Sequence, residues 1–155
     1  MTWGIRSLKT TSKVSVIVLD YNGAQIATRC LRSVKASDYA NLDLIVVDNA
    51  STDDSVFVIR KNLPDVRLVT NEVNLGFAGA NNRGYKESSG KFVFFLSNDT
   101  VVDKFCISEL VALASRNRST AAIQPKIYLG SSNRFQTAEK LLDISAKQGL
   151  FQRIL

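Results

Sequence analysis

Short apolar runs alternate with stretches of mixed polarity along the first three quarters of the chain. These runs are rich in Val, Ile and Phe and lie at 14–19, 43–48, 66–70 and 91–97. Buried parallel strands have this length and composition because both of their faces are covered. The intervening spacing of apolar residues predicts helices near 24–36, 52–62, 77–88 and 103–116. Four such alternations predict an α/β fold, in which right-handed crossovers join mostly parallel strands and helices flank both faces of the sheet.

Capping residues and breakers refine these boundaries. Ser51, with Asp54 three residues later, predicts a capping-box start for the second helix, and Pro64 predicts its end. Asp103 is the expected cap of the fourth helix. A fifth strand is expected near 120–127, with Pro125 suited to an edge or an end. The periodicity then fades, so 129–134 is expected to be a loop and 135–155 a helix or an irregular tail.

Polar residues follow every predicted strand. The first strand runs into Asp20-Tyr21-Asn22, the second into Asp48-Asn49, the third into Thr70-Asn71 and the fourth into Ser97-Asn98-Asp99. Ligands of open parallel sheets bind outside the carboxyl ends of the strands. The sequence therefore predicts that side chains from four separate loops form one binding edge.

Composition and charge exclude several classes of function. The chain has 155 residues and a net charge of +6, and the excess basic residues lie in 1–13 and 116–155. There is no basic stripe interleaved with aromatic residues, so nucleic acid is not an expected partner. Basic ends favour either an ordinary solvated surface or contact with an anionic membrane. No apolar run suits a signal peptide or a bilayer span, so we expect a cytoplasmic protein, or one peripheral at the inner face of the membrane.

The cysteine and histidine content argues against zinc. Cys30 and Cys106 have no paired spacing, and the chain has no His. Two buried thiols in a reducing compartment are the simplest expectation.

A phosphate-binding glycine loop is missing from this sequence. The turn after the first strand holds one glycine, Gly23, where a dinucleotide fingerprint needs three, and no P-loop pattern occurs. Phosphates would instead need a divalent metal that bridges them to a carboxylate, and Asp99 is placed for this. Asp48 suits a ribose hydroxyl or a pyrimidine N–H, and Tyr21 and Asn22 suit a base. A structural alternative stays open for each residue, because Asp and Asn also cap helices and make turns.

Four segments resemble family 2 glycosyltransferases, and most of all their rhamnosyltransferase-like branch. They are VSVIVLDYNG from Val14, DNASTDDS from Asp48, NLGFAGANNRG from Asn74 and LSNDTVV from Leu96. The likeness covers roughly residues 13 to 128, with the blocks in the family's order and spacing. It implies a GT-A fold, a UDP- or dTDP-sugar donor and Mg²⁺ or Mn²⁺.

The resemblance assigns roles to residues at all four blocks. Asp20, Tyr21 and Asn22 would line the nucleobase, with Asp20 standing where the family usually has Thr or Asn. Asp48 would bind the base or ribose, and Gly79 with Asn82 would form a loop beside the donor. Asn98 and Asp99 belong to the counterpart of the family's DxD motif, in which Ser97 replaces the first acid. Asp99 is then the expected metal ligand.

The resemblance also predicts that an acceptor-binding half is missing. Family members continue into a half that binds the glycan or lipid-linked acceptor and supplies the catalytic base. Here no motif supports a base among Glu109, Glu139 and Asp143. We expect a basic leader (1–13), a nucleotide-sugar-binding domain (14–128) and a basic C-terminal segment (129–155). Alternatives are a non-catalytic donor-binding module or subunit that self-associates or needs a partner and, more remotely, a nucleotidyltransferase.

Overall fold

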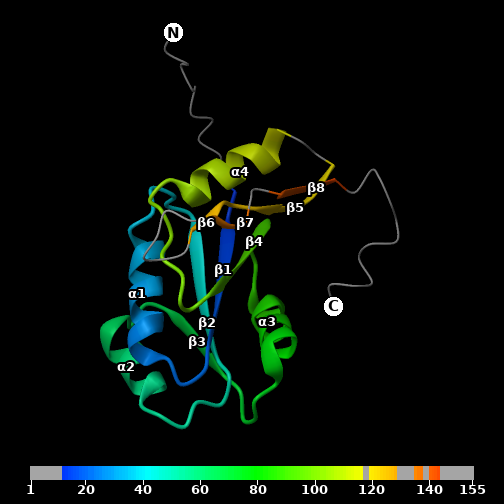
Figure 1. Cartoon of the computed structure of the whole chain (residues 1–155). Coiled ribbons are helices and arrows are strands. Elements are labelled where there is room, and N and C mark those ends of the chain that lie inside the picture. Colours follow the sequence, from blue (N-terminus) through cyan, green and yellow to red (C-terminus); the bar gives the residue numbers. More distant parts are fainter. Residues whose placement is uncertain (1–11, 117–118, 129–134, 138–139, 144–155) are drawn as a thin grey trace. The chain divides into compact units, whose positions relative to one another are not determined.

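The computed structural model describes residues 12–116, 119–128, 135–137 and 140–143 (Figure 1). The chain divides into two compact units, of which one spans Thr11–Phe105 and the other contains the described residues from Cys106 onward. The expected loop at 129–134 and the segment 144–155 lie outside the described residues, as does most of the expected leader.

The first unit is a four-stranded parallel sheet with helices between its strands. Its elements are β1 (Val14–Asp20), α1 (Ala24–Lys35), β2 (Leu42–Asp48), α2 (Ser55–Asn62), β3 (Arg67–Thr70), α3 (Gly76–Glu87) and β4 (Phe92–Ser97). The strand order is β3-β2-β1-β4, and every neighbouring pair is parallel. The predicted α/β fold class is confirmed.

The core lies on both faces of β1 and β2. On one face Ile17, Ile45 and Val47 pack with Ala80 of α3. α1 and α2 lie on the other side of the sheet (Figure 1), and Leu31 and Val34 of α1 are fully buried. Gly84 lets α3 approach the sheet closely, because a Cβ there would lie 2.5 Å from Ile17 Cγ2.

A charged cluster ties together the amino ends of the strands, opposite to the predicted binding edge. Asp43 Oδ2 accepts a hydrogen bond from Arg67 Nη2 at 2.6 Å and lies 3.6 Å from Lys13 Nζ. Ser15 Oγ donates to the same carboxylate. Burial alone would raise the pKa of Asp43, but the Arg67 hydrogen bond and charge outweigh it, and the net shift is downward. The cluster therefore holds Asp43 ionised.

Two predicted caps are wrong. α2 begins at Ser55, with Asp54 at the N-cap and no side-chain capping bond, so Ser51 does not start it. α4 (Cys106–Arg116) begins three residues after Asp103, whose Oδ1 accepts a hydrogen bond from the Phe105 amide in the preceding turn. In both places the side chain that resembles a cap is used by the connecting loop.

The second unit combines α4 with short antiparallel strands. These are β5 (Thr120–Gln124), β6 (Ile127–Tyr128), β7 (Phe135–Thr137) and β8 (Lys140–Asp143). β5 pairs with β8, and β6 with β7, so β5 does not extend the parallel sheet. The prediction of a helix or irregular tail is wrong for 135–137 and 140–143, because two-residue to five-residue strands carry too little periodicity to reveal their pairing.

The burial of the two cysteines and the length and polarity of the helices bear on expectations from the sequence. Cys30 is buried, as expected, whereas Cys106 is only partly buried. None of the helices in the described part of the chain has the length and apolar character needed to cross a bilayer.

Candidate functional site

The carboxyl ends of the strands in the first unit are level with one another. Asp20 lies in register with Asp48, Asp48 with Thr70, and Leu19 with Ser97. The loops that follow these residues therefore gather at one edge of the sheet (Figure 1). This is the arrangement that the polar strand ends predict.

Hydrogen bonds join the loop after β1 to the loop after β2. Asn22 has φ 51°, and its side-chain oxygen accepts hydrogen bonds from the amides of Thr52 (2.8 Å) and Asp53 (3.4 Å). Its own amide donates to Ser51 Oγ at 2.9 Å. The side-chain oxygen of Asn22, a residue predicted to line the base, thus accepts hydrogen bonds from the neighbouring loop.

Asn49 performs the same task between the loops after β2 and β3, and the sequence reasoning missed it. Its side chain is buried and donates to Asn74 Oδ1 at 2.8 Å. Its Oδ1 accepts hydrogen bonds from Asn71 Nδ2 and from the Leu75 amide, each at 3.0 Å. The signal that could have found it is its place directly after Asp48, opposite the Asn-rich segment after β3.

A third link joins the ends of β1 and β4. Asp20 is fully buried, and its Oδ1 accepts a 2.7 Å hydrogen bond from Asn98 Nδ2. Beside this carboxylate, the Gly23 amide donates to Ser55 Oγ at 3.1 Å. Burial raises the pKa of Asp20 and the Asp48 carboxylate adds to the rise, while the hydrogen bonds, that of Asn98 foremost, oppose it.

Asp48 is held at the centre of the edge. It is 2% exposed, and its Oδ2 accepts a hydrogen bond from the Ser51 amide at 3.1 Å. Ala50, between them, has φ 67°, a left-handed conformation that is unfavourable for a residue with a Cβ. Among the described residues, Asp48 Oδ1 and Asp20 Oδ2 are buried oxygens without a hydrogen-bond partner. An unpaired buried acceptor is costly, so Asp48 Oδ1, at the centre of the edge, indicates a use beyond the fold.

Other predicted residues face solvent. Tyr21 is 49% exposed, and Asp99 is exposed without a hydrogen bond or ion pair to any described residue. Gly79 and Asn82 lie within α3 and not in a loop, and Asn82 is exposed. Tyr21 and Asp99 are thus available to a ligand at this edge, while Asn82 lies further along α3.

The thiol of Cys30 lies beneath the turn that carries Asp99. Its Sγ donates to the Ser97 carbonyl at 3.6 Å. Burial raises the pKa of Cys30 to about 12, and the nearby Asp99 charge contributes. The thiol is therefore protonated and serves as a donor that supports the turn.

Asp99 can hold a metal ion only together with oxygen atoms from a bound ligand, because one carboxylate does not complete the coordination of the ion. No group of three or more His, Cys, Asp or Glu side chains in the described residues could hold a metal ion. Mg²⁺ typically binds one or two carboxylates together with substrate phosphates and water, so one exposed carboxylate is a sufficient protein contribution. Asp99 would hold the cation, and a diphosphate would supply the remaining oxygens.

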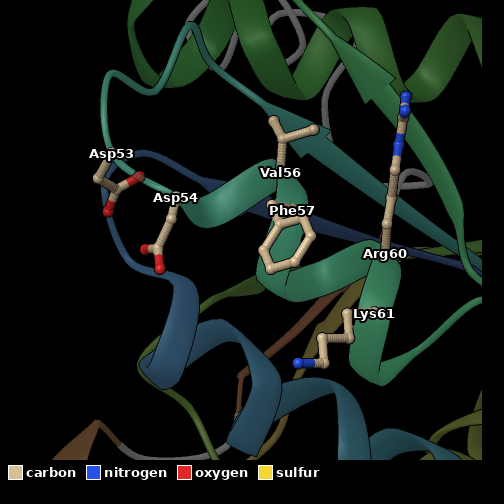
Figure 2. Close-up of a pocket in the computed structure, with 6 residues that line it drawn as sticks. All are labelled: Asp53, Asp54, Val56, Phe57, Arg60 and Lys61. Atoms are coloured by element: carbon tan, nitrogen blue, oxygen red, sulfur yellow. The ribbon is translucent and has the colours of Figure 1, made fainter.

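A separate groove lies on the outer side of α2. It is lined by Asp53, Asp54, Val56, Phe57, Arg60 and Lys61 (Figure 2). Phe57 is 65% exposed, and Lys61 Nζ lies 5.8 Å from the centre of its ring. None of the predicted ligand residues lines this groove, so it is distinct from the strand-end site.

The amino-acid sequence is similar to those of several bacterial glycosyltransferases. The UDP-Glc:α-D-GlcNAc-diphosphoundecaprenol β-1,3-glucosyltransferase WfgD of Escherichia coli is 37% identical over 89 residues, which are 57% of this chain and 35% of the relative. The poly-β-1,6-N-acetyl-D-glucosamine synthase of Staphylococcus epidermidis is 30% identical, covering 81% of this chain and 32% of the relative. The chain spans about a third of the length of the curated relatives it matches.

Solved structures and a family profile agree with these relatives. The mannosyltransferase PcManGT from Pyrobaculum calidifontis, solved with GDP-Man and Mn²⁺, superposes with a TM-score of 0.67 at 26% identity, covering 77% of this chain and 37% of that one. The sequence profile described as Glycosyl transferase family 2 matches residues 15–153. The chain has the GT-A fold and belongs to glycosyl transferase family 2.

Proposed function

We propose that this chain is the donor-binding part of an inverting glycosyltransferase, which binds a nucleoside-diphosphate sugar together with a divalent metal. The observation that carries the proposal is the level carboxyl edge of β2, β1 and β4, where Tyr21 after β1 and Asp99 after β4 are exposed and Asp48 ends the neighbouring strand β2. This edge is the usual ligand position in an open parallel sheet.

Each residue at this edge would have its own role in holding the donor. Tyr21 would stack on the nucleobase, because a half-exposed aromatic ring at the strand end offers an apolar face. Asp48 Oδ1, which accepts no hydrogen bond from the described residues, would accept one from a base N–H or a ribose hydroxyl. Asn82 and the small Gly79 would approach the sugar side of the donor from α3.

The metal ion would be Mg²⁺ or Mn²⁺, held by Asp99. When bound, it supplies positive charge that stabilises the departing diphosphate. The chain's own contribution is to hold Asp99 at the end of β4, on a turn that Cys30 supports from below. Mn²⁺ in the related mannosyltransferase structure supports this assignment.

The sugar, the base and the acceptor are further parts of the proposal. The names of the relatives include both UDP-Glc and GDP-Man, so the nucleotide must be tested as UDP, dTDP and GDP in parallel. The likeness to the rhamnosyltransferase-like branch favours a rhamnose-type donor. The chain spans about a third of the length of its relatives. The site for a glycan or lipid-linked acceptor and the catalytic base would therefore lie elsewhere than at the carboxyl ends of the strands.

Nucleotide binding with and without metal tests the proposal. Isothermal titration of the chain with UDP, dTDP and GDP should show binding of at least one nucleotide, strengthened by Mn²⁺. Asp99→Ala should remove the strengthening by Mn²⁺ and leave the weaker binding measured in EDTA, because base and ribose contacts do not involve Asp99.

A matched control comes from an acid elsewhere on the surface. Asp65→Ala removes an exposed carboxylate that pairs with Lys35, away from the strand ends, and should leave nucleotide binding unchanged. The absence of binding of all three nucleotides, or equal Mn²⁺ dependence in Asp99→Ala, would contradict the proposal.

A further inference from the structure

The side chains of Asp20 and Asn98 form a link between the two loops that hold opposite ends of the ligand site. Asp20 ends β1, next to the base-stacking Tyr21, and Asn98 precedes the metal ligand Asp99. Asn98 Nδ2 donates to Asp20 Oδ1 at 2.7 Å, across 78 residues of sequence. A hydrogen bond to a buried carboxylate is among the stronger kinds in proteins.

The surroundings favour this link over ligand contact for either residue. Asp20 is 0% exposed, and its Oδ1 is already paired with Asn98 Nδ2 within the protein. A Cβ at Gly23 would lie 2.6 Å from Asn98 Nδ2 and 2.8 Å from Asp20 Oδ1. The glycine is therefore needed because the linked side chains fill the space beside it.

We propose that Asp20 and Asn98 are positioning residues, which act as a latch that holds Asp99 at the correct distance from the nucleotide for a shared metal ion. This inference rests on the proposed function and assigns these two residues a different role from direct ligand contact. The turn after β4 is exposed at Ser97 and Asp99, and the described contacts that hold this segment include the latch, the Cys30 thiol and the Ser33 hydroxyl, which accepts a hydrogen bond from the Val102 amide. Of these, the latch is made by the residue directly before Asp99. Without the latch, Asp99 would bind metal at the cost of ordering its own turn.

Three variants separate the latch from its alternatives. Asn98→Ala removes the donor. Gly23→Ala displaces both partners sterically while leaving them intact, and its backbone tolerates alanine because φ is −137°. Asp20→Asn retains an oxygen that accepts the bond, so it should preserve the latch. Asn62→Ala, which removes an exposed amide at the end of α2, is the control for truncation of an asparagine.

The measurement is the affinity of UDP, dTDP and GDP with Mn²⁺ and with EDTA, together with the unfolding temperature of each variant. Asn98→Ala and Gly23→Ala should each reduce the gain in affinity from Mn²⁺ by about tenfold, the size expected for one buried charged hydrogen bond. Combining them should cause no further loss, because both break the same contact. Asp20→Asn and Asn62→Ala should keep the full gain, and affinity in EDTA should be the same in all variants.

Each other outcome overturns a defined part of the inference. A lower unfolding temperature with an unchanged Mn²⁺ gain would mean that the bond is only structural. A loss of affinity in EDTA for Asn98→Ala, without the same loss for Gly23→Ala, would mean that Asn98 contacts the nucleotide directly. If the wild-type chain binds none of UDP, dTDP and GDP, the proposed function fails and the latch loses its role with it.

Discussion

Asn49 offers the sharpest test of how the ligand edge is built. Its substitution by alanine removes three hydrogen bonds no longer than 3.0 Å, to Asn74, Asn71 and the Leu75 amide. Asn49 is only 3% exposed, so the groups that it bonds would be left without a hydrogen-bond partner in the substituted protein. At about 1 kcal/mol for each bond, the free energy of unfolding should fall by about 3 kcal/mol. For a chain of this size that corresponds to a fall in Tm of about 6–12 °C.

Thermal unfolding followed by circular dichroism, with urea titration as a second measure, tests this magnitude. Asn62→Ala is the matched control, because that exposed side chain donates to the Val58 carbonyl of its own helix and accepts one long, exposed hydrogen bond of 3.4 Å from Arg32 Nη2. It should change the free energy of unfolding by less than about 0.5 kcal/mol. A fall in Tm of less than about 2 °C for Asn49→Ala would refute the idea that Asn49 holds the two loops together.

Two further predictions concern the sheet. Arg67→Gln should lower the free energy of unfolding by about 1 kcal/mol at pH 7. The pKa of Asp43 is lowered in the folded chain, so this difference should be fully present above the ordinary pKa of about 4 and be lost progressively as pH falls from there through the lowered folded pKa. Urea titrations from pH 7 down to about pH 2 in which the difference stayed constant would contradict it. Gly84→Ala should lose about 1–3 kcal/mol, because its Cβ would meet Ile17 at 2.5 Å. Arg83→Ala, on the exposed side of α3, should be near neutral by the same thermal measurement.

The first unit could be predicted because its signals are local. Each strand is a continuous apolar run, and the helices between them follow from the spacing of residues such as Leu31 and Val34. Parallel strands that end at similar places bring their ends together without further information, so Asp48 and Asp99 could be placed at one edge in advance. The family followed from four blocks that keep their order and spacing.

The second unit could not be predicted in this way. β8 pairs with β5, so that Lys140 lies opposite Gln124, and this pairing is decided by contacts between segments distant in sequence. Short strands of three to five residues look like loops until their partners are known. The same limit explains why Ser51 resembled a helix cap, because its hydroxyl accepts a hydrogen bond from the backbone amide of Asn22, 29 residues away.

The sequence by itself determined which polar residues reach the ligand edge, since strand ends and family blocks are properties of the chain. Only the tertiary structure decided which of them face a ligand and which face one another. Asn22, Asn49 and Asn98 carry the same amide as a ligand-binding asparagine, yet their described hydrogen bonds go to neighbouring loops. An amide bonds to whichever donor or acceptor lies nearest, and that neighbour exists only once the strands have aligned.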